Sequence, residues 1–320
     1  MSVTTPVLYI VFNRPDATLQ SFAAIREAKP KYLYVAADGP RAHKPGEAAL
    51  CEEVRKIATT IDWDCELHTL FREQNLGCGL GVSGGINWFF ENVEQGIIIE
   101  DDCIVDQSFF PYCEELLEKY KDNTEVMHIG GNNFFTKDFS NGESYYFIKY
   151  FTVWGWATWR RAWKLYDIDM KMLDDFLDSG KLEQTTMNAK QTAYWRHIFE
   201  TMRSKKIDTW DYQWVLTCWY YGAYAVMPVK NLVTNVGFGE DATHTTAENK
   251  ASYISLQSLD KVVHPPHIAR NRKADSLTYT TYFEVPQHLN IARNILYKIF
   301  PTSAMMQLRK IRRKFFPNIK

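Results

Sequence analysis

The sequence predicts an α/β fold in which helices cover both faces of a mixed, mostly parallel β-sheet. Strand-like and helix-like patterns alternate over the first hundred residues, and such alternation is typical of parallel sheets. The strand-like runs are continuously apolar, as expected for strands that are buried on both faces. The chain of 320 residues is 46% hydrophobic and 15% aromatic, which is enough for a large core.

Four strands and three helices are expected in this first part of the chain. The strands are Val7–Phe12, Tyr32–Ala37, Glu66–Phe71 and Gly96–Ile99. The first helix ends at Lys29 and Pro30, and the second covers about residues 47–60. The third follows a glycine-rich loop at 77–85 and runs through Trp88. Beyond residue 132 the sequence is rich in aromatic residues, and helices are expected near Trp159–Tyr166, Ala189–Arg203 and Asp211–Tyr221.

Composition excludes several classes of protein. A formal net charge of −1 excludes a generically basic nucleic-acid-binding protein. No uncharged apolar run reaches the ~20 residues of a membrane span, and Val7–Phe12 lacks the basic residues of a secretory signal. The six cysteines form no Cys-x-x-Cys pair, which argues against a zinc site or a disulfide framework. A reducing, cytoplasmic location is the simplest interpretation.

Basic residues are concentrated at the end of the chain. The 36 residues after Glu284 hold eight Lys or Arg and no acidic residue. Helical spacing places four apolar residues of this tail on one face: Ala304, Leu308, Ile311 and Phe315. Residues 302–320 are therefore expected to form a basic amphipathic helix. Such a helix either lies on an anionic membrane surface, which would make the protein peripheral on the inner face of the plasma membrane, or docks on the body of the protein.

Polar and charged residues follow each of the four expected strands. They are Asn13 and Arg14, then Asp38, then Arg72 and Asn75, and last Glu100-Asp101-Asp102. Because ligands bind outside the carboxyl ends of parallel strands, these residues are expected to share one site. Adjacent carboxylates at a buried strand end are costly unless a cation offsets their charge. Mg²⁺ or Mn²⁺ suits such a run, with water and substrate phosphates as further ligands; the alternative is a solvated turn.

Two further motifs allow a functional or a structural interpretation. Gly79–Gly84 matches the Gly-x-Gly-x-x-Gly dinucleotide fingerprint, but it follows the third strand instead of the first, after a slack polar loop. It would alternatively bring backbone N–H groups to a phosphate. Four tryptophans belong either to the core or to a wall that stacks on sugar rings: Trp154, Trp156, Trp159 and Trp163.

Three segments of the second half are similarly open. Asp208 and Asp211 precede an expected helix, where an aspartate is either a cap or a positioned general base. The segment 235–245, which contains His244, is either a surface turn or a lid over a diphosphate. The run His264-Pro-Pro-His267 is expected to be a solvated linker.

In their order and placement, these motifs resemble those of GT-A glycosyltransferases, in particular bacterial nucleotide-diphospho-sugar transferases. The resemblance covers about residues 6–245 and leaves out the tail. Glu100-Asp101-Asp102 is similar to the acidic metal motif of that fold, in the form found in animal N-acetylglucosaminyltransferase I. The other segments that carry the resemblance are Val7–Phe12 with Asn13-Arg14, Ala36–Gly39, Arg72–Gly77, Asp106–Phe110, Gly155-Trp156 and Trp210-Asp211.

The resemblance implies a metal-dependent, inverting glycosyltransferase that uses a nucleotide-diphosphate sugar, most simply a UDP-sugar, and a glycan or lipid-linked acceptor. Residues 1–131 would bind the donor, residues 132–261 the acceptor, and residues 262–320 would be a connecting segment and tail. Asp102 would bind Mn²⁺ or Mg²⁺. Asp211 would be the catalytic base, although Tyr212 replaces the second acid of the family's Trp-Asp-Asp-Trp pattern, so Asp208 is an alternative. The implied donor contacts are Asn13, Arg14, Asp38, Arg72, Asn75, Asp101, Trp156 and His244.

Two other classes of function remain open from the sequence. A Rossmann-type enzyme would bind NAD or another adenosine cofactor at Gly79–Gly84 without a metal. A non-catalytic carbohydrate-binding protein would use the tryptophans and would need neither UDP nor a metal. No feature of the sequence indicates an oligomeric state.

Overall fold

The computed structural model describes residues 3–133, 135, 139–237 and 255–283. Residues 1–276 form one compact unit, and residues 277–283 are the described part of a second unit. Both expected halves, 1–131 and 132–261, therefore fall within the first unit. His244 and the basic tail at 302–320 lie outside the described residues.

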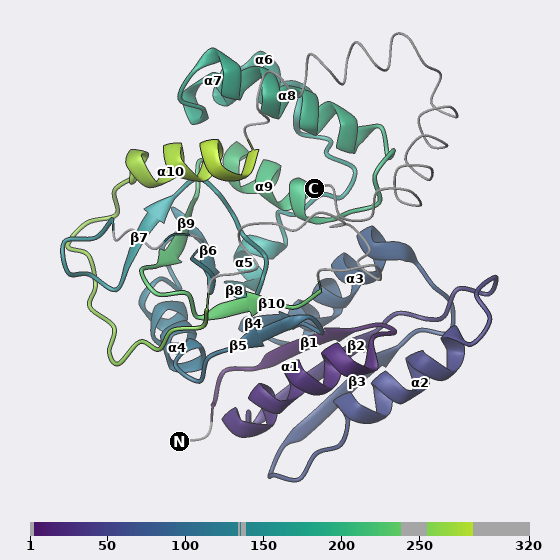
Figure 1. The fold of residues 1–320 in the computed structure, drawn as a ribbon. Helices are drawn as coiled ribbons and strands as arrows, with labels where there is room; N and C mark the ends of the chain where they lie inside the picture. Colours follow the sequence, from purple (N-terminus) through teal and green to yellow (C-terminus); the bar gives the residue numbers. More distant parts are fainter. Residues whose placement is uncertain (1–2, 134, 136–138, 238–254, 284–320) are drawn as a thin grey trace, which may run out of the picture. The chain divides into compact units, whose positions relative to one another are not determined.

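The first unit is built on an eight-stranded sheet with the strand order β3-β2-β1-β4-β8-β6-β9-β7 (Figure 1). Strands β1 to β4 are parallel, β8 is antiparallel to both of its neighbours, and β7 is antiparallel to β9. Strands β5 and β10 form a separate antiparallel pair. The bounds are β1 Val7–Val11, β2 Tyr32–Ala37, β3 Glu66–Phe71, β4 Gln95–Glu100, β5 Cys103–Val105, β6 Val126–Gly130, β7 Tyr145–Ile148, β8 Trp156–Trp159, β9 Tyr224–Pro228 and β10 Val233–Asn235.

Alternate residues of the central strands face opposite layers of helices. Val7 and Tyr9 of β1 belong to a core shared with α1, α2 and α4, whereas Tyr34 of β2 packs edge-on against Phe89 of α3. No helix among the described residues is long and apolar enough to cross a membrane. The helices are α1 Pro15–Ala28, α2 Glu47–Ala58, α3 Gly77–Asn92, α4 Phe109–Lys119, α5 Arg160–Trp163, α6 Leu173–Asp178, α7 Lys181–Thr185, α8 Ala189–Arg203, α9 Asp211–Tyr220 and α10 Arg272–Thr278, with a π-helical turn at Tyr279–Phe283.

The predicted fold class is confirmed: the sheet is mixed, mostly parallel and flanked by helices. The bounds of β1 to β4 differ from the expected ones by at most one residue. The helix expected from Trp159 onward is wrong in part, because residues 156–159 form the strand β8 and only Arg160–Trp163 is helical.

The glycine-rich loop expected at residues 77–85 is also wrong, because α3 begins at Gly77. Gly77 has a φ of +82°, a left-handed conformation that favours glycine and turns the chain into the helix. The carboxylate of Asp208 then accepts hydrogen bonds from the backbone N–H groups of Cys78 at 2.8 Å and Gly79 at 2.9 Å. It satisfies N–H groups that would otherwise lack a partner in the first turn. A distant aspartate, which no local pattern reveals, therefore caps α3.

The segment around His264 is largely exposed, as expected, but it is not a free linker, because side-chain contacts hold it in place. His264 Nδ1 lies 2.9 Å from the hydroxyl of Tyr145, and His264 Nε2 lies 3.0 Å from a carboxylate oxygen of Glu115. Val263 and Ser144 exchange further hydrogen bonds. These contacts fix the segment along the edge strand β7 and the helix α4.

Candidate functional site

A cavity of ≈ 750 Å³ lies where the strands β1, β2 and β4 end. It is lined by the last residues of these strands and by segments of the second half, including residues 207–212. This is the edge at which ligands of parallel sheets bind. Seven of the predicted site residues line it: Arg14, Asp38, Arg72, Asn75, Asp101, Asp102 and Asp211.

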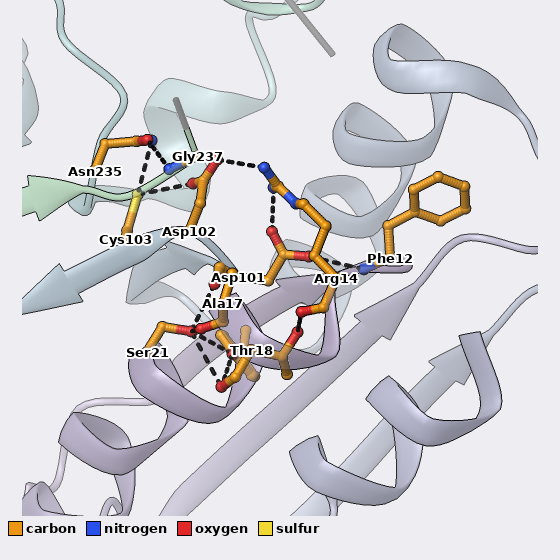
Figure 2. A network of polar contacts seen from close by, with 11 residues as sticks. Phe12, Arg14, Ala17, Thr18, Ser21, Asp101, Asp102, Cys103, Asn235 and Gly237 are labelled. Atoms are coloured by element: carbon orange, nitrogen blue, oxygen red, sulfur yellow. Dashed lines mark hydrogen bonds and ion pairs between the residues drawn. The ribbon is translucent and has the colours of Figure 1, made fainter. Parts of the chain in front are cut away.

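Arg14 joins the two aspartates that follow β4 (Figure 2). Its guanidinium donates through Nη2 to Asp101 Oδ1 and through Nη1 to Asp102 Oδ2, the latter at 3.0 Å. The backbone N–H of Phe12 donates to the other oxygen of Asp101 at 3.2 Å. Burial raises the pKa of the Asp101 carboxyl to about 6, against the opposing charge of Arg14. Asp101 therefore anchors Arg14 at the cavity.

Asp102 is the more accessible of the two aspartates. Its side chain is 14% exposed, whereas that of Asp101 is 3% exposed. The N–H of Val236, just after β10, donates to the carbonyl of Asp102 at 2.8 Å and fixes its backbone. Gly237 lies directly against the Asp102 carboxylate, and a Cβ there would overlap both Asp102 and Arg14. A glycine therefore keeps open the space around this carboxylate.

The cavity carries more acidic than basic side chains. The carboxylates are those of Asp38, Glu100, Asp101, Asp102, Asp208 and Asp211, and the guanidiniums are those of Arg14, Arg41 and Arg72. Burial, together with the charges of Asp102 and Asp101, raises the pKa of Glu100 well above its usual range. We call Glu100, Asp101, Asp102 and Arg14 the carboxylate rim.

The donor set of the carboxylate rim fits a hard divalent cation. Carboxylate oxygens are the ligands that Mg²⁺ and Mn²⁺ prefer, and a cation would offset the excess negative charge. Within the part of the chain that the structure describes, no three His, Cys, Asp or Glu side chains are arranged to hold a metal by themselves. A cation at Asp102 would therefore complete its coordination with water and with a bound phosphate ligand.

Asp38 and Asn75 line the cavity, but Asp38 is held by hydrogen bonds from Asn75 and from neighbouring backbone N–H groups. The Asp38 carboxylate accepts hydrogen bonds from Gly39 N, from Asn75 Nδ2 and from Leu76 N, each at 2.9 Å. These bonds join the end of β2 to the turn before α3. Burial raises the pKa of Asp38, and the backbone hydrogen bonds oppose this shift. The contact with the nucleotide sugar that the resemblance implies for Asp38 would have to be made beside these three bonds.

Arg72 differs from the other two arginines of the cavity. Arg14 pairs with Asp101 and Asp102, and Arg41 pairs with Glu47. Arg72 forms no ion pair with any residue that the structure describes. Against the larger effect of burial, its charge lowers the pKa of the Asp38 carboxyl without a direct ion pair between the two side chains, so the guanidinium can still contact an anionic ligand.

Arg41 is a cavity residue that the sequence interpretation missed. Its backbone N–H and its guanidinium donate to the buried carboxylate of Glu47, and the guanidinium lies over the ring of Phe12, 5.3 Å from the ring centroid. Asn13 is expected to contact the nucleotide sugar. However, it does not line the cavity, and its side-chain amide instead donates a hydrogen bond to Glu47 at 2.9 Å. Asn13 thus acts through Glu47 on Arg41. The sequence signal that could have identified Arg41 as a cavity residue is its position, only four residues after the end of β2.

Asp208 and Asp211 both line the cavity but are held differently. Both oxygens of Asp208 accept from the first turn of α3. Asp211 uses only Oδ1, which accepts from the hydroxyl of Thr209 and from the backbone N–H of Tyr212 at 2.9 Å. Among the described residues, no hydrogen bond engages Oδ2 of Asp211. Asp211 is therefore the aspartate with an oxygen free to accept a proton.

Trp156 is fully buried, which corrects the expectation that it contacts the nucleotide sugar. Its indole is stacked on His128, with ring centroids 4.9 Å apart, and on Trp210, with centroids 5.8 Å apart. The rings of Trp163 and Trp214 pack against the same indole, with centroids 6.1 and 5.8 Å from its own. We call these five residues the indole cluster. Trp154 and Trp210 do line the cavity.

The fold is that of an α/β protein with a cavity at the carboxyl edge of a Rossmann-like sheet. No protein-family model matches the sequence, and no curated protein matches it. HddC from Yersinia pseudotuberculosis is similar over 49% of this chain and 78% of its own, with 8% identity and a TM-score of 0.31. UDP-glucose pyrophosphorylase complexed with UDP-glucose is similar over 51% and 78%, with 9% identity and a TM-score of 0.30. TarS 1-349 of S. aureus is similar over 51% and 49%, with 12% identity and a TM-score of 0.32.

Proposed function

We propose that the protein is a divalent-metal-dependent glycosyltransferase. It would move a sugar from a nucleotide-diphosphate sugar, most simply a UDP-sugar, to a hydroxyl of a glycan or lipid-linked acceptor. The observation that supports this proposal is the carboxylate rim. Arg14 bridges Asp101 and Asp102 at the end of parallel strands. Around them the described residues of the cavity include more carboxylates than guanidiniums, and the guanidinium of Arg72 forms no ion pair with any of these residues.

In this proposal each charged group of the cavity has a distinct task. Asp102 would hold Mn²⁺ or Mg²⁺, which stabilises the negative charge that develops on the leaving diphosphate. Asp101 would keep Arg14 oriented toward the same phosphates. Arg72, which has no carboxylate partner among the described residues, would bind a further phosphate oxygen.

Asp211 would act as the general base. Thr209 and Tyr212 hold one of its oxygens, and no hydrogen bond among the described residues engages the other. It would take the proton from the acceptor hydroxyl as that oxygen attacks the anomeric carbon and the bond to the diphosphate breaks. A single displacement of this kind inverts the anomeric configuration, and by analogy with glycoside hydrolysis its transition state has oxocarbenium character.

Calorimetry with UDP, in the presence and absence of Mn²⁺, tests this proposal. The native protein is expected to bind UDP with Mn²⁺ and to lose most of this affinity without it. Asp102→Ala should abolish the Mn²⁺-dependent part while the unfolding midpoint stays close to the native one. Asp62→Ala, which removes a half-exposed carboxylate paired with Arg26, is the matched control and should bind normally. UDP binding that ignores both Mn²⁺ and Asp102 would overturn the metal assignment.

The rival dinucleotide function has less support from the fold. Gly79, Gly81 and Gly84 lie inside α3 instead of in a turn before it. The N-terminal N–H groups that would receive a pyrophosphate are already bonded to Asp208. Binding of NAD without a metal would restore this rival.

The acceptor side of the proposal includes the basic tail. We propose that residues 302–320 hold the enzyme at an anionic membrane surface, where lipid-linked acceptors are presented. Deletion of these residues should weaken sedimentation with anionic liposomes. Equal sedimentation of the two proteins would favour docking of the tail on the body.

A further inference from the structure

The glycines of the Gly-x-Gly-x-x-Gly motif each lie against a charged side chain of the cavity. A Cβ added at Gly79 would lie 2.7 Å from Asp208 Oδ1. At Gly81 it would lie 3.0 Å from Asp38 Oδ2, and at Gly84 it would lie 2.6 Å from Arg72 Nη2. The three charged groups therefore rest on the backbone of α3 at places where no side chain intervenes.

Gly84 is not explained by its own backbone. It lies in the middle of α3, and its φ is not in the left-handed region that favours glycine. Alanine stabilises the interior of a helix more than glycine does, because glycine loses more conformational freedom on folding. The space of the missing side chain is occupied by the guanidinium of Arg72, which a methyl group would displace.

We propose that Gly84 is a positioning residue, which fixes the guanidinium of Arg72 as an anion-binding group of the cavity. Arg72 lines the cavity and forms no ion pair with any described residue, so a displaced guanidinium would leave its ligand without this charge. The inference rests on the proposed function in one respect: it names a phosphate of the nucleotide as the anion that Arg72 binds.

Gly84 is the position at which this effect can be separated from folding. The atom that a new methyl group would meet is the far end of a flexible arginine, which can move away without disturbing the backbone. At Gly81 the neighbour is Asp38, which three hydrogen bonds hold in place. At Gly79 the backbone oxygen of Thr209 also lies 3.1 Å from the added Cβ. Substitutions at these two glycines would disturb the fold as well.

Calorimetric titration with UDP and Mn²⁺ tests the proposal on Gly84→Ala, Arg72→Ala and the double variant. Gly84→Ala should weaken UDP binding roughly tenfold, about the value of one charge-assisted hydrogen bond, while its unfolding midpoint is equal to or higher than the native one. The double variant should bind no more weakly than Arg72→Ala alone, because the methyl group acts only through Arg72. Unchanged UDP affinity in Gly84→Ala, or losses that multiply in the double variant, would overturn the proposal.

Gly85→Ala is the matched control on the same helix. Its added methyl group would meet the Cβ of Ala36 at 3.0 Å instead of a charged side chain. It is expected to lower stability and to leave UDP affinity within about twofold of the native value. A loss of affinity as large as that of Gly84→Ala would show that any methyl group on α3 has this effect, and would overturn the specific role of Gly84.

A second measurement separates this inference from the proposed function. If the native protein binds no UDP, the proposed function fails. Denaturant unfolding of the native protein, Gly84→Ala, Arg72→Ala and the double variant still tests the contact between position 84 and Arg72. Gly84→Ala should then raise stability more in the Arg72→Ala background than in the native one, because only the native background contains the clash. Equal changes in both backgrounds would show that position 84 and Arg72 are not coupled.

Discussion

The carboxylate rim and the indole cluster both reach the cavity, but the rim carries ionisable carboxyl groups next to a guanidinium, whereas the indole cluster is uncharged. In the carboxylate rim, two of the three adjacent acids, Asp101 and Asp102, pair with the single guanidinium of Arg14. In the indole cluster, the only ionisable group is His128, and burial lowers its pKa to about 3, so the ring is neutral. Its Nε2 lies 2.9 Å from the carbonyl of Thr152, and its Nδ1 accepts from Trp214 Nε1 at 3.2 Å.

This difference in charge indicates two separate roles at the cavity, one in binding and one in structural support. The carboxylate rim holds more carboxyl groups than its one guanidinium pairs with, whereas the indole cluster satisfies its own histidine and gives a rigid support. Trp210 belongs to both regions, because it lines the cavity and also stacks on Trp156. Asp211 follows Trp210 in the chain, so the indole cluster places the group that faces the cavity.

Replacement of Asp211 gives the largest expected effect at this junction. Asp211→Asn keeps the size of the side chain and the bonds of Oδ1 but cannot accept the acceptor's proton, so sugar transfer should fall at least a hundredfold. UDP affinity in the presence of Mn²⁺ should stay within about twofold of the native value, since Asp211 is not expected to touch the nucleotide. Transfer rates and calorimetry on the same preparation measure both quantities.

Asp208→Asn is the control for this experiment. Asp208 caps α3, and the loss of its charge beside the helix N-terminus should lower the free energy of unfolding by about 1 kcal/mol. Transfer should remain within a few-fold of the native rate. If Asp208→Asn loses transfer and Asp211→Asn retains it, the roles of the two aspartates are exchanged.

The sequence predicts the carboxylate rim well because its position follows from topology. Apolar runs locate the ends of β1 and β4, and parallel strands bring these ends to one edge, so Arg14, Asp101 and Asp102 have to gather there. The direction of each side chain is a different matter. Asn13 is adjacent to Arg14 in the chain, yet it faces Glu47, because that buried carboxylate accepts its amide.

The indole cluster is poorly predicted because it depends on partners that are distant in the chain. The sequence leaves Trp156 either in the core or in a wall that stacks on sugars. The structure places it in the core, because β8 inserts as an antiparallel strand between β4 and β6 and turns this indole into the layer under α9. No local pattern shows where a strand will insert. Likewise, Asp208 caps a helix that begins at Gly77, and this pairing of distant segments is visible only in the folded chain.

A smaller effect, on stability instead of activity, tests the account of the indole cluster. His128 is neutral in the folded protein down to about pH 3, whereas a histidine in the unfolded chain gains a proton near pH 6.5. The unfolded state therefore binds more protons as the pH falls below 6.5, and stability must fall with it. Between pH 7 and 4.5 this single group should account for a loss of about 2.5 kcal/mol in the free energy of unfolding.

His128→Asn isolates this contribution. Asparagine still offers Trp214 an acceptor but has no titratable ring, so the variant should be less stable at pH 7 and should lose less stability on acidification than the native protein. Denaturant unfolding at several pH values between 7 and 4.5 measures the difference between the two slopes. His43→Asn, at an exposed position, should follow the native slope. Parallel curves for His128→Asn and the native protein would mean that His128 takes up a proton in the folded state and that the indole cluster holds a charge after all.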